Sequence, residues 1–461
     1  MANPRTLIFF IPALFSLYFV IRGNPEKAFL RVYLPALLGL PYYFACALPH
    51  MPAISISEAA VIPIVVGSLL LYSSRWTFSR LDIWVVLYLL SFAASEVLRE
   101  TRVTDGYFNI FTATVSILFP YMVGKLLIEP HLRLPAVKMF VVVILVVGAA
   151  GLYELRMGLN PFTLLQRYLV GYSNGPWSLQ FRNGRARVAV SFSDAELAGI
   201  AFTITLALNW WLFEIGKLHR FHADKLGAKF SWLERRHIPG LILIALILLT
   251  QSRGPMLGAI LAFVIIQIPR FKNVRRAMMV TACLLAVGAA ALYTYFDHYT
   301  ASAINNTTAS EQAQSASYRR LLLDNYAPIA EEGGWLGWGI NSRPIVAGQR
   351  SIDNEFLLLH VTQGRLGLIL FALIVIETLW HLLRLTWQFK AREDLYFAFC
   401  MLAAMAALWA TITTVYLGEQ LPQVAFLLAG WGQALKEQSG TQIQAVTSDK
   451  HPRFSFKRIF T

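Results

Sequence analysis

The sequence predicts an all-α, polytopic helical bundle that spans a membrane, and its composition and the lengths of its apolar runs carry that prediction. Of the 461 residues, 56% are hydrophobic and 14% are charged, whereas an average soluble domain has about 25% charged residues. Apolar runs that are long enough to cross a bilayer, which takes roughly 20 residues, recur along most of the chain. A membrane β-barrel would show alternating segments of about ten residues instead.

We expect about 12–13 membrane spans from runs of this length. In chain order they lie at residues 7–21, 33–49, 54–72, 82–98, 108–128, 136–153, 193–213, 238–252, 255–269, 276–296, 354–383 (with a broken span as the alternative), 395–416 and 421–435. The first run resembles a signal peptide, but it has no small-residue cleavage site and more spans follow it. The predicted transmembrane domain is therefore residues 1–436, followed by a basic, disordered cytoplasmic tail at residues 437–461.

Basic residues exceed acidic ones, 40 to 26, which gives a net charge of +14. In a soluble protein this would suggest nucleic-acid binding, but in a multi-pass protein it is typical of loops retained on the cytoplasmic side. The basic segments at residues 217–236, 270–276 and 384–392 agree in parity with the span order. We therefore place them inside, with the N-terminus outside, and predict no nucleic-acid partner. The three cysteines lie in apolar runs without metal-ligand spacing, so we predict no metal site.

The longest segment on the predicted outer side is residues 297–352. A loop of this length inside a compact domain is usually functional. An apolar stripe from Tyr318 to Ile329 predicts an amphipathic helix in it, which Pro328 should kink or end. The following stretch, "EEGGWLGWGIN", supplies glycines for tight turns and the tryptophans Trp335 and Trp338, which suit a membrane interface.

An arginine stands between two predicted spans in "LLTQSRGPMLGAI", residues 248–260. At the bilayer centre Arg253 would cost about 2.5–3.5 kcal/mol, although its side chain could also extend toward the lipid headgroups. Gly254 permits a sharp turn and Pro255 suits the first position of a helix. These residues predict that one span ends at the outer face, with Arg253 in the turn beside the start of the next.

Two other stretches predict helix starts on the same side. In "SFSDAELAG" Ser193 and Glu196 have the spacing of a capping box, and in "SIDNEFLLLH" Asp353 or Asn354 is an N-cap candidate. Helix N-termini carry about half a positive charge and favour anions, and arginine suits phosphate through its forked donor array. If the three ends converge, they form a site for a phosphorylated, lipid-linked ligand.

Several of these stretches also resemble known motifs. "LTQSRGPMLGAILAFVI" resembles the Ser-Arg-Gly motif of the O-antigen ligase and O-antigen polymerase superfamily. "YRRLLLDNYAPIAEEGGWLGWGIN" is similar to the family's arginine-bearing loop segment, and "DNEFLLLHVTQGRLGLILF" to the motif that follows it. "YELRMGLNPF" and "RVAVSFSDAELAGIAF" resemble upstream family segments. Their order and spacing carry the resemblance over roughly residues 150–385.

The resemblance implies a metal-independent, inverting glycosyltransferase of the bacterial inner membrane, with a GT-C-like helical fold, an active site facing the periplasm and no cofactor. Its partners would be undecaprenyl-pyrophosphate-linked oligosaccharides as donor and acceptor, membrane lipid and, as a further candidate, a chain-length regulator. Family arginines that hold the pyrophosphate match Arg187, Arg253 and either Arg319 or Arg320. A surface pair with Asp324, four residues further on, would equally explain Arg320.

The chain departs from the family where ligases have a histidine before the Asn of the loop-end motif, because Asp353 stands there. Asp353 is either a general base, which needs reach and a suitable pKa, or only a helix cap; Glu355 is the second catalytic candidate. Asn354, Glu196 and Trp338 are candidates for acceptor binding, with capping as the alternative for Glu196.

The absence of this histidine favours a polysaccharide polymerase. A ligase that hands the glycan to lipid A–core is the first alternative, and a transporter of lipid-linked sugars is the second. The transporter is disfavoured because the two halves of the chain show no convincing repeat and acidic residues inside the spans are scarce.

Overall fold

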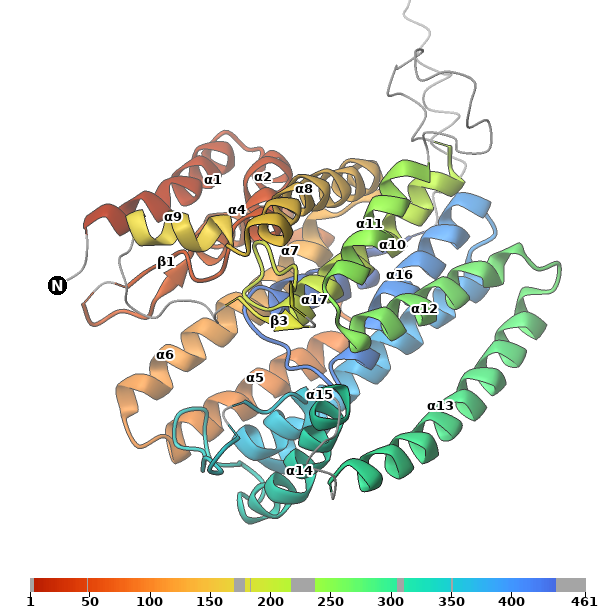
Figure 1. Ribbon diagram of the computed structural model, residues 1–461. Helices are drawn as coiled ribbons and strands as arrows, with labels where there is room; N and C mark the ends of the chain where they lie inside the picture. Colours follow the sequence, from red (N-terminus) through yellow and green to blue (C-terminus); the bar gives the residue numbers. More distant parts are fainter. Residues whose placement is uncertain are drawn as a thin grey trace, which may run out of the picture.

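The computed structural model describes residues 4–47, 49–169, 179–182, 184–216, 237–304, 311–349 and 351–436. In these residues nine helices are long and apolar enough to cross a membrane, and the strands are limited to two short antiparallel pairs. The prediction of an all-α, multi-pass membrane protein is therefore confirmed (Figure 1). Four expected spans coincide instead with shorter helical pieces.

The elements of the N-terminal part are η1 (Pro4–Phe10), α1 (Ile11–Ile21), α2 (Pro25–Ala28), η2 (Phe29–Tyr33), α3 (Leu34–Gly39), β1 (Ala45–Cys46), β2 (Ile54–Ser55), α4 (Ile56–Tyr72), η3 (Ser73–Arg75), α5 (Arg80–Arg99), α6 (Val103–Ala113), η4 (Thr114–Leu118), α7 (Phe119–Leu127), α8 (Pro130–Met157), α9 (Pro161–Leu169), β3 (Phe181–Arg182) and β4 (Arg185–Ala186). The elements that follow are α10 (Ala195–Glu214), α11 (Ile238–Leu249), α12 (Arg253–Gln267), η6 (Ile268–Arg270), α13 (Val274–Ile304), α14 (Glu311–Glu332), α15 (Glu355–Gln388), α16 (Arg392–Thr411) and α17 (Leu421–Ala434).

The span predicted at residues 33–49 is wrong in its position. Helical backbone runs from Pro25 to Gly39, and β1 then pairs with β2. Leu40 has an extended backbone, with φ −116° and ψ 140°. It precedes Pro41, whose ring disfavours helical torsions in the residue before it. The apolar run thus continues past the end of the helix. A span boundary predicted from the length of the apolar run alone was therefore too late in the chain.

Two helical segments contain a π-helical turn, η2 and η4, and each turn ends two residues before a proline. Pro120 is the second residue after η4, within the helix of residues 103–127. A proline has no N–H to donate to the carbonyl four residues earlier, and its ring would clash with that carbonyl. The wider π turn relieves this conflict and reshapes the helix locally, which is a common feature of functional sites.

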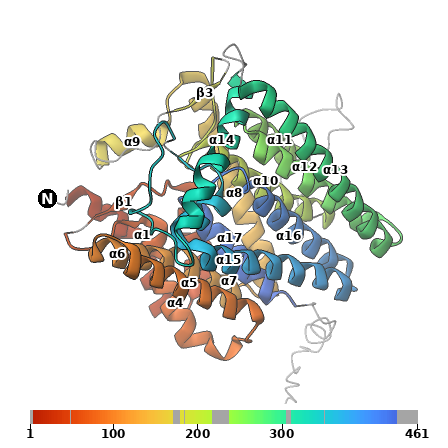
Figure 2. The same cartoon turned by 90° about the horizontal axis from the view of Figure 1, so that it is seen from below.

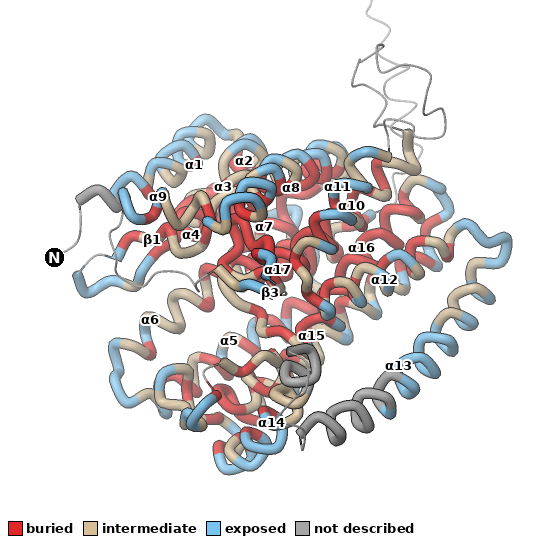
Figure 3. Tube along the Cα trace, viewed as in Figure 1, coloured by how far each residue is buried: buried red, intermediate tan, exposed pale blue. Residues whose placement is uncertain are grey.

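The centre of the bundle is formed by α10, α16 and α17, while α13 stands apart (Figures 1 and 3). In α10 and α16, 78% and 83% of the apolar stretch is buried, whereas none of the apolar stretch of α13 is. Glycines let α7 and α17 cross closely: a Cβ on Gly430 would lie 2.1 Å from the carbonyl oxygen of Tyr121. Small residues commonly permit such close approach between membrane helices.

Helix α15 is broken at Gly364, which has φ 68° and ψ −167°, so the predicted break in this span is confirmed. The loop after α14 satisfies the backbone groups that the break leaves unpaired. The amides of Trp338 and Gly339 donate to the carbonyls of Val361 and Thr362, at 3.0 and 2.9 Å. Arg365 donates in return to the carbonyl of Gly334, at 3.0 Å. These hydrogen bonds attach the glycine-rich loop after α14 to α15 at its break.

Helix α14 lies across the outer end of α15, as the view from below shows (Figure 2). Its predicted apolar stripe is confirmed, because Leu322, Tyr326 and Ala330 pack with Ile352 and Val361 in a small separate core. Of the two outcomes expected at Pro328, a kink or a helix end, the helix end is wrong, since α14 continues to Glu332. The first residues of the expected outer loop, 297–304, belong to α13, which extends to Ile304.

Candidate functional site

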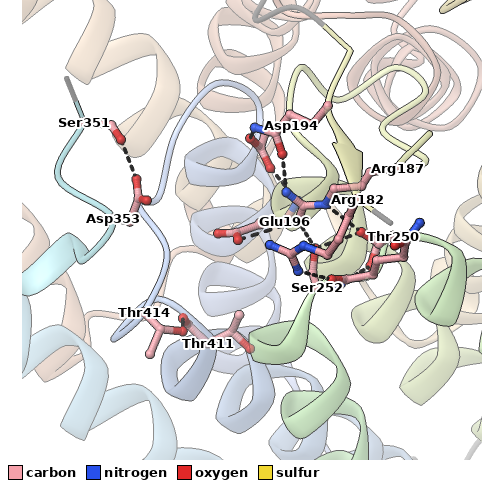
Figure 4. A network of polar contacts seen from close by, with 12 residues as sticks. Arg182, Arg187, Asp194, Glu196, Thr250, Ser252, Ser351, Asp353, Thr411 and Thr414 are labelled. Carbon is pink, nitrogen blue, oxygen red and sulfur yellow. Dashed lines mark hydrogen bonds and ion pairs between the residues drawn. The ribbon is translucent and has the colours of Figure 1, made fainter. Parts of the chain in front are cut away.

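Three helix N-termini meet at one end of the bundle (Figure 4), so the convergence that the expected anion site requires is present. Asp194 caps α10 by accepting a hydrogen bond from the amide of Glu196, at 2.6 Å. Asn354 caps α15 by accepting one from the amide of Leu357, at 3.1 Å. Ser252 is the N-cap residue of α12, but its side chain makes no capping hydrogen bond. The positive ends of three helix dipoles therefore point into one region.

The local details differ from the prediction at two of these starts. Ser193 does not cap α10, because its hydroxyl donates to the carboxylate of Glu419. The turn before α12 is made by Gln251, with φ 52°, and not by Gly254. Helix α12 then begins at Arg253 itself, so Gly254 and Pro255 lie in its first turn.

Arg187 is buried at the centre of this region, with 5% of its surface exposed. Its Nε donates to the carbonyl of Thr250 at 3.0 Å, and its Nη2 donates to Oγ of Ser252 at 2.6 Å. Its Nη1 donates to the side-chain oxygen of Gln180. Arg187 thus ties the residues before α10 to the turn between α11 and α12. Most of its donors are already used, which makes it a positioning residue as well as a source of charge.

Glu154, near the end of α8, fixes the segment that follows Arg187 through hydrogen bonds to its backbone. The carboxylate of Glu154 is fully buried and accepts hydrogen bonds from the amides of Ala189 and Val190, at 3.0 and 2.9 Å. It also accepts one from Asn160, at 3.0 Å. Val190 has a positive φ of 50°, and such strained backbone persists only where its surroundings hold it. These contacts give Glu154 a structural role in positioning the segment of Arg187.

Glu196 lies between two arginines. Its Oε1 is 3.6 Å from Nη2 of Arg187 and 3.4 Å from Nη2 of Arg319. The capping role considered for Glu196 belongs to Asp194 instead. Of the two candidate arginines on α14, Arg319 is the one that reaches this carboxylate; Arg320 follows it and is partly exposed. The outer helix α14 is therefore linked electrostatically to α10.

Arg182, in β3, belongs to the same cluster although the sequence did not single it out as a site residue. It donates to the carbonyl of Gln251 at 2.6 Å. Burial lowers the pKa of Arg182, and the positive charges of Arg187, Arg253 and Arg319 lower it further, against an opposing effect of Glu196. A lowered pKa caused by neighbouring cations means that positive charge is concentrated here, and such a site favours an anion.

Arg253 is the first residue of α12. It is the most exposed of the four clustered arginines, which are Arg182, Arg187, Arg253 and Arg319. Among the residues that the structure describes, no carboxylate lies within ion-pairing distance of its guanidinium. A cavity of about 820 Å³ adjoins this region, and its wall includes Gln251, Arg156 and Arg185 together with apolar side chains from the ends of α8 and α11. The wall of this cavity is therefore partly basic and partly apolar, and Gln251, whose carbonyl accepts from Arg182, joins it to the cluster.

Carboxylates form the other side of the region. Burial raises the pKa of Asp194, and the nearby charge of Asp353 raises it further, while Arg187 lowers it. Asp353 is half-buried and accepts a hydrogen bond from Oγ of Ser351 at 2.8 Å (Figure 4). Since Asn354 is the cap of α15, the carboxylate of Asp353 is not occupied by the helix end. The capping alternative for Asp353 is therefore wrong.

The remaining candidates have structural partners. Glu355 is buried, and its Oε2 accepts from the amide of Leu417 at 2.7 Å, which fixes α15 to the segment between α16 and α17. Trp338 donates from its indole to the carbonyl of Ile329 at 2.8 Å, within the small core of α14. Asn354 uses its side-chain oxygen as the helix cap. The predicted tail at residues 437–461 lies outside the described residues.

Together these residues form a site with two poles. Four arginines and three helix N-termini can stabilise negative charge on a bound anion, because preorganised donors need no reorganisation as charge develops. The carboxylates of Asp353 and Glu419 face the same region from other elements and can accept a proton or hydrogen bonds from hydroxyl groups. The arrangement suits transfer of a group from an anionic leaving group to a hydroxyl.

Comparison with known proteins adds one finding. Residues 238–372 match the family model described as O-antigen ligase. The matched range runs from α11 into α15 and contains Arg253, Arg319, Arg320 and Asp353, but not Arg187 or the start of α10. No curated protein matches the chain.

Proposed function

We propose that this chain, a multi-pass membrane enzyme of the O-antigen ligase and polymerase superfamily, is a polysaccharide polymerase. In this proposal it transfers a glycan from undecaprenyl pyrophosphate onto a hydroxyl group of another lipid-linked repeat unit. The reaction takes place at the periplasmic face of the bacterial inner membrane. The basic loops predicted to be cytoplasmic support this orientation, because they follow helix ends opposite the arginine cluster.

The observation that carries the proposal is the arginine cluster at the three converging helix N-termini. Of its four arginines, Arg187 and Arg319 are within ion-pairing distance of the Glu196 carboxylate, whereas Arg182 donates to the carbonyl of Gln251. Arginine forks match phosphate oxygens, and a pyrophosphate carries more negative charge than a single carboxylate. The adjoining 820 Å³ cavity has apolar residues beside its arginines, which suits the start of a polyprenyl chain.

The proposed step is a single displacement. The acceptor hydroxyl oxygen forms a bond to the anomeric carbon, the bond from that carbon to the phosphate oxygen breaks, and its electron pair remains on the pyrophosphate. Asp353 takes the hydroxyl proton, and the arginines stabilise the leaving group. Attack from the side opposite the leaving group inverts the anomeric configuration. Glu355 is the less suitable base, because one of its oxygens already accepts from Leu417.

A ligase is the second candidate, and the family model favours it by its description. The chemistry at the donor would be the same, and only the acceptor would change to lipid A–core. The carboxylate of Asp353 at the position where ligases of the family have a histidine favours the polymerase instead.

Glycan analysis of a strain lacking the chain separates the two. A polymerase predicts that single lipid-linked repeat units accumulate and that long polymer is absent from every carrier. A ligase predicts long chains that remain on undecaprenyl pyrophosphate. Normal polymer that is also normally attached would reject both functions.

Purified protein tests the details of the mechanism. Lipid-linked repeat units incubated with the wild-type chain should yield a product ladder, and the ladder should persist in the presence of a metal chelator. The anomeric configuration of the new linkage should be opposite to that in the donor, which NMR of the product determines. Retention of configuration would reject the single displacement, and a ladder that disappears with the chelator would reject metal independence.

A further inference from the structure

A second cavity, of about 330 Å³, lies between α5, the segment from α6 to η4, α15 and α17. It is at the lower end of the range of about 300–1,000 Å³ that is typical of small-molecule sites. We call it the α5–α15 cavity. It is separate from the 820 Å³ cavity beside the arginines, since the two have no lining residue in common. Of its lining residues, Glu355 and Glu419 are discussed above, and the cavity itself has no role there.

The lining of the α5–α15 cavity combines hydrogen-bonding groups with aromatic walls. Its polar members are the carboxylates Glu355 and Glu419, the amides Asn109 and Gln363, Arg343 and the hydroxyl residues Tyr42, Tyr88, Thr112, Ser116 and Thr362. Phenylalanines from α5, α15 and α17 complete the wall. A few polar groups in an apolar, aromatic surround are characteristic of ligand sites.

One buried group in this lining has an unused hydrogen-bonding atom. Gln363 is 3% exposed, and its Nε2 donates to the hydroxyl of Tyr88 at 3.3 Å. Its Oε1 has no partner among the described residues. A buried amide oxygen without a partner carries a desolvation penalty, and a donor on a bound ligand would remove that penalty. Gln363 directly precedes Gly364, the residue at which α15 is broken. The loop that contains Trp338 is hydrogen-bonded to α15 at this break.

The α5–α15 cavity reaches the catalytic region through Glu419. Ser193, beside the cap of α10, donates to the carboxylate of Glu419, and Gln420 donates to the carbonyl of Ser191 at 3.1 Å. Glu419 has a positive φ of 56°, a strained conformation of the kind that clusters at functional sites. Glu355, on the same cavity wall, is two residues from Asp353. A ligand in this cavity would therefore approach the carboxylate pole of the site.

We propose that the α5–α15 cavity binds the terminal sugar of the acceptor glycan, as an uncharged, hydroxyl-rich residue. The inference rests on the proposed function, because it assigns a place to the second substrate of that reaction. Hydroxyl groups both donate and accept, which matches the mixed lining of amides, phenols and carboxylates. The lining has two carboxyl groups against one arginine, so it offers an acidic sugar no excess of positive charge.

This assignment gives the two substrates opposite approaches. The donor pyrophosphate lies at the arginine pole, and the acceptor sugar enters from the carboxylate pole. Its reacting hydroxyl is directed toward Asp353. The separation agrees with the origin of the side chains, because the arginines come from β3, the segment before α10, α12 and α14, whereas Asp353 and Glu419 precede α15 and α17.

Binding of free glycan tests the inference directly. The probe is the repeat-unit oligosaccharide released by mild acid from the lipid-linked intermediate, and its binding to the full-length purified chain is followed by saturation-transfer NMR. We expect Gln363→Leu and Arg343→Ala each to weaken binding about tenfold, the effect of one lost hydrogen bond to a buried group. Arg253→Ala should bind the probe like the wild type. A neutral hexose should compete with the probe, and a hexuronic acid should not.

The control is Gln388→Leu, which makes the same change at the exposed far end of α15, and size-exclusion profiles verify that each variant is folded. If Gln363→Leu and Arg343→Ala both bind like the wild type, or if the wild type does not bind, the inference is overturned. Turnover measurements distinguish failure of the cavity assignment from failure of the proposed function. With lipid-free oligosaccharide as acceptor, the two variants should raise the acceptor KM and leave the donor KM unchanged. Glycan binding without any polymerase or ligase turnover would reject the function and keep the cavity.

Discussion

The pairing of charged side chains differs between the two ends of the bundle. At the end remote from the candidate site, cations and carboxylates pair one to one. Nζ of Lys125 is 2.6 Å from Oδ1 of Asp82, and Nη1 of Arg133 is 2.5 Å from Oδ1 of Asp394. All four side chains are at most 4% exposed. Such pairs neutralise charge locally and join neighbouring helices.

At the candidate site the balance is different. Arg187 and Arg319 share one oxygen of Glu196 at distances above 3.3 Å, and Arg182 relies on a backbone carbonyl. Arg253 has no carboxylate in range among the described residues. A site that keeps positive charge without matching it is organised for a ligand that supplies the negative charge. The contrast distinguishes structural ion pairs from functional ones within one chain.

The largest effect should follow from breaking a one-to-one pair. Lys125→Ala leaves Asp82 charged and buried, and removing one partner of a buried pair typically destabilises a protein by about 3–5 kcal/mol. Thermal unfolding in detergent should show a strong decrease in Tm. Turnover per folded molecule should remain at the wild-type level. The double variant Lys125→Met with Asp82→Leu should recover most of the stability, because no unpaired charge remains. A single variant as stable as the wild type would contradict the structural role.

The converse is expected at the candidate site. Arg253→Ala should lower turnover about 10²–10³-fold, as for removal of one preorganised donor to a developing anion, while Tm stays close to that of the wild type. Arg253→Lys should retain part of the activity, because it keeps the charge but not the fork. Arg270→Ala, near the other end of the same helical segment, is the matched control. Normal polymer from a folded Arg253→Ala protein would remove the pyrophosphate role.

The third effect concerns the carboxylate pole. Asp353→Asn should lower turnover about 10²-fold by removing the general base, without destabilising α15, since Asn354 provides the cap. Asn354→Ala should instead lower stability by about 1 kcal/mol. Initial rates and unfolding curves of both variants separate the two roles. Full activity in Asp353→Asn would assign the base to another carboxylate.

The sequence predicted the location of the site better than its contacts. Charged residues are so rare near the spans that Arg253 and the cap residues at the two other helix starts stood out, and their helix ends do converge. Which of two neighbouring residues caps a helix depends on one backbone torsion, and here Asp194 has the extended conformation, with φ −126° and ψ 145°. Ser193 and Asp194 are equally good caps by residue type.

Long-range contacts explain what the sequence could not reveal. Arg182 and Arg185 both flank the turn of the β3–β4 hairpin, and no local pattern shows that only Arg182 reaches the carbonyl of Gln251. Glu419 enters the site through Ser193, 226 positions earlier in the chain. In the fold, the apolar run beyond Gly39 concealed the end of α3, because hydropathy does not register the effect of Pro41 on the residue before it.

The smallest effect should come from Glu419, which belongs to the carboxylate pole. Burial raises the pKa of Glu419 to about 7, although hydrogen bonds from Ser193 oppose the shift. A carboxyl whose pKa is raised in the folded state stabilises the protein fully below its unfolded pKa, and this contribution is lost as the pH rises through the folded pKa. Tm should therefore decrease by a few degrees between about pH 5 and about pH 8, and Glu419→Gln, which stays neutral, should show a flatter profile. If both proteins have the same pH profile, Glu419 is already ionised in the folded state, and it then adds a full negative charge to the carboxylate pole.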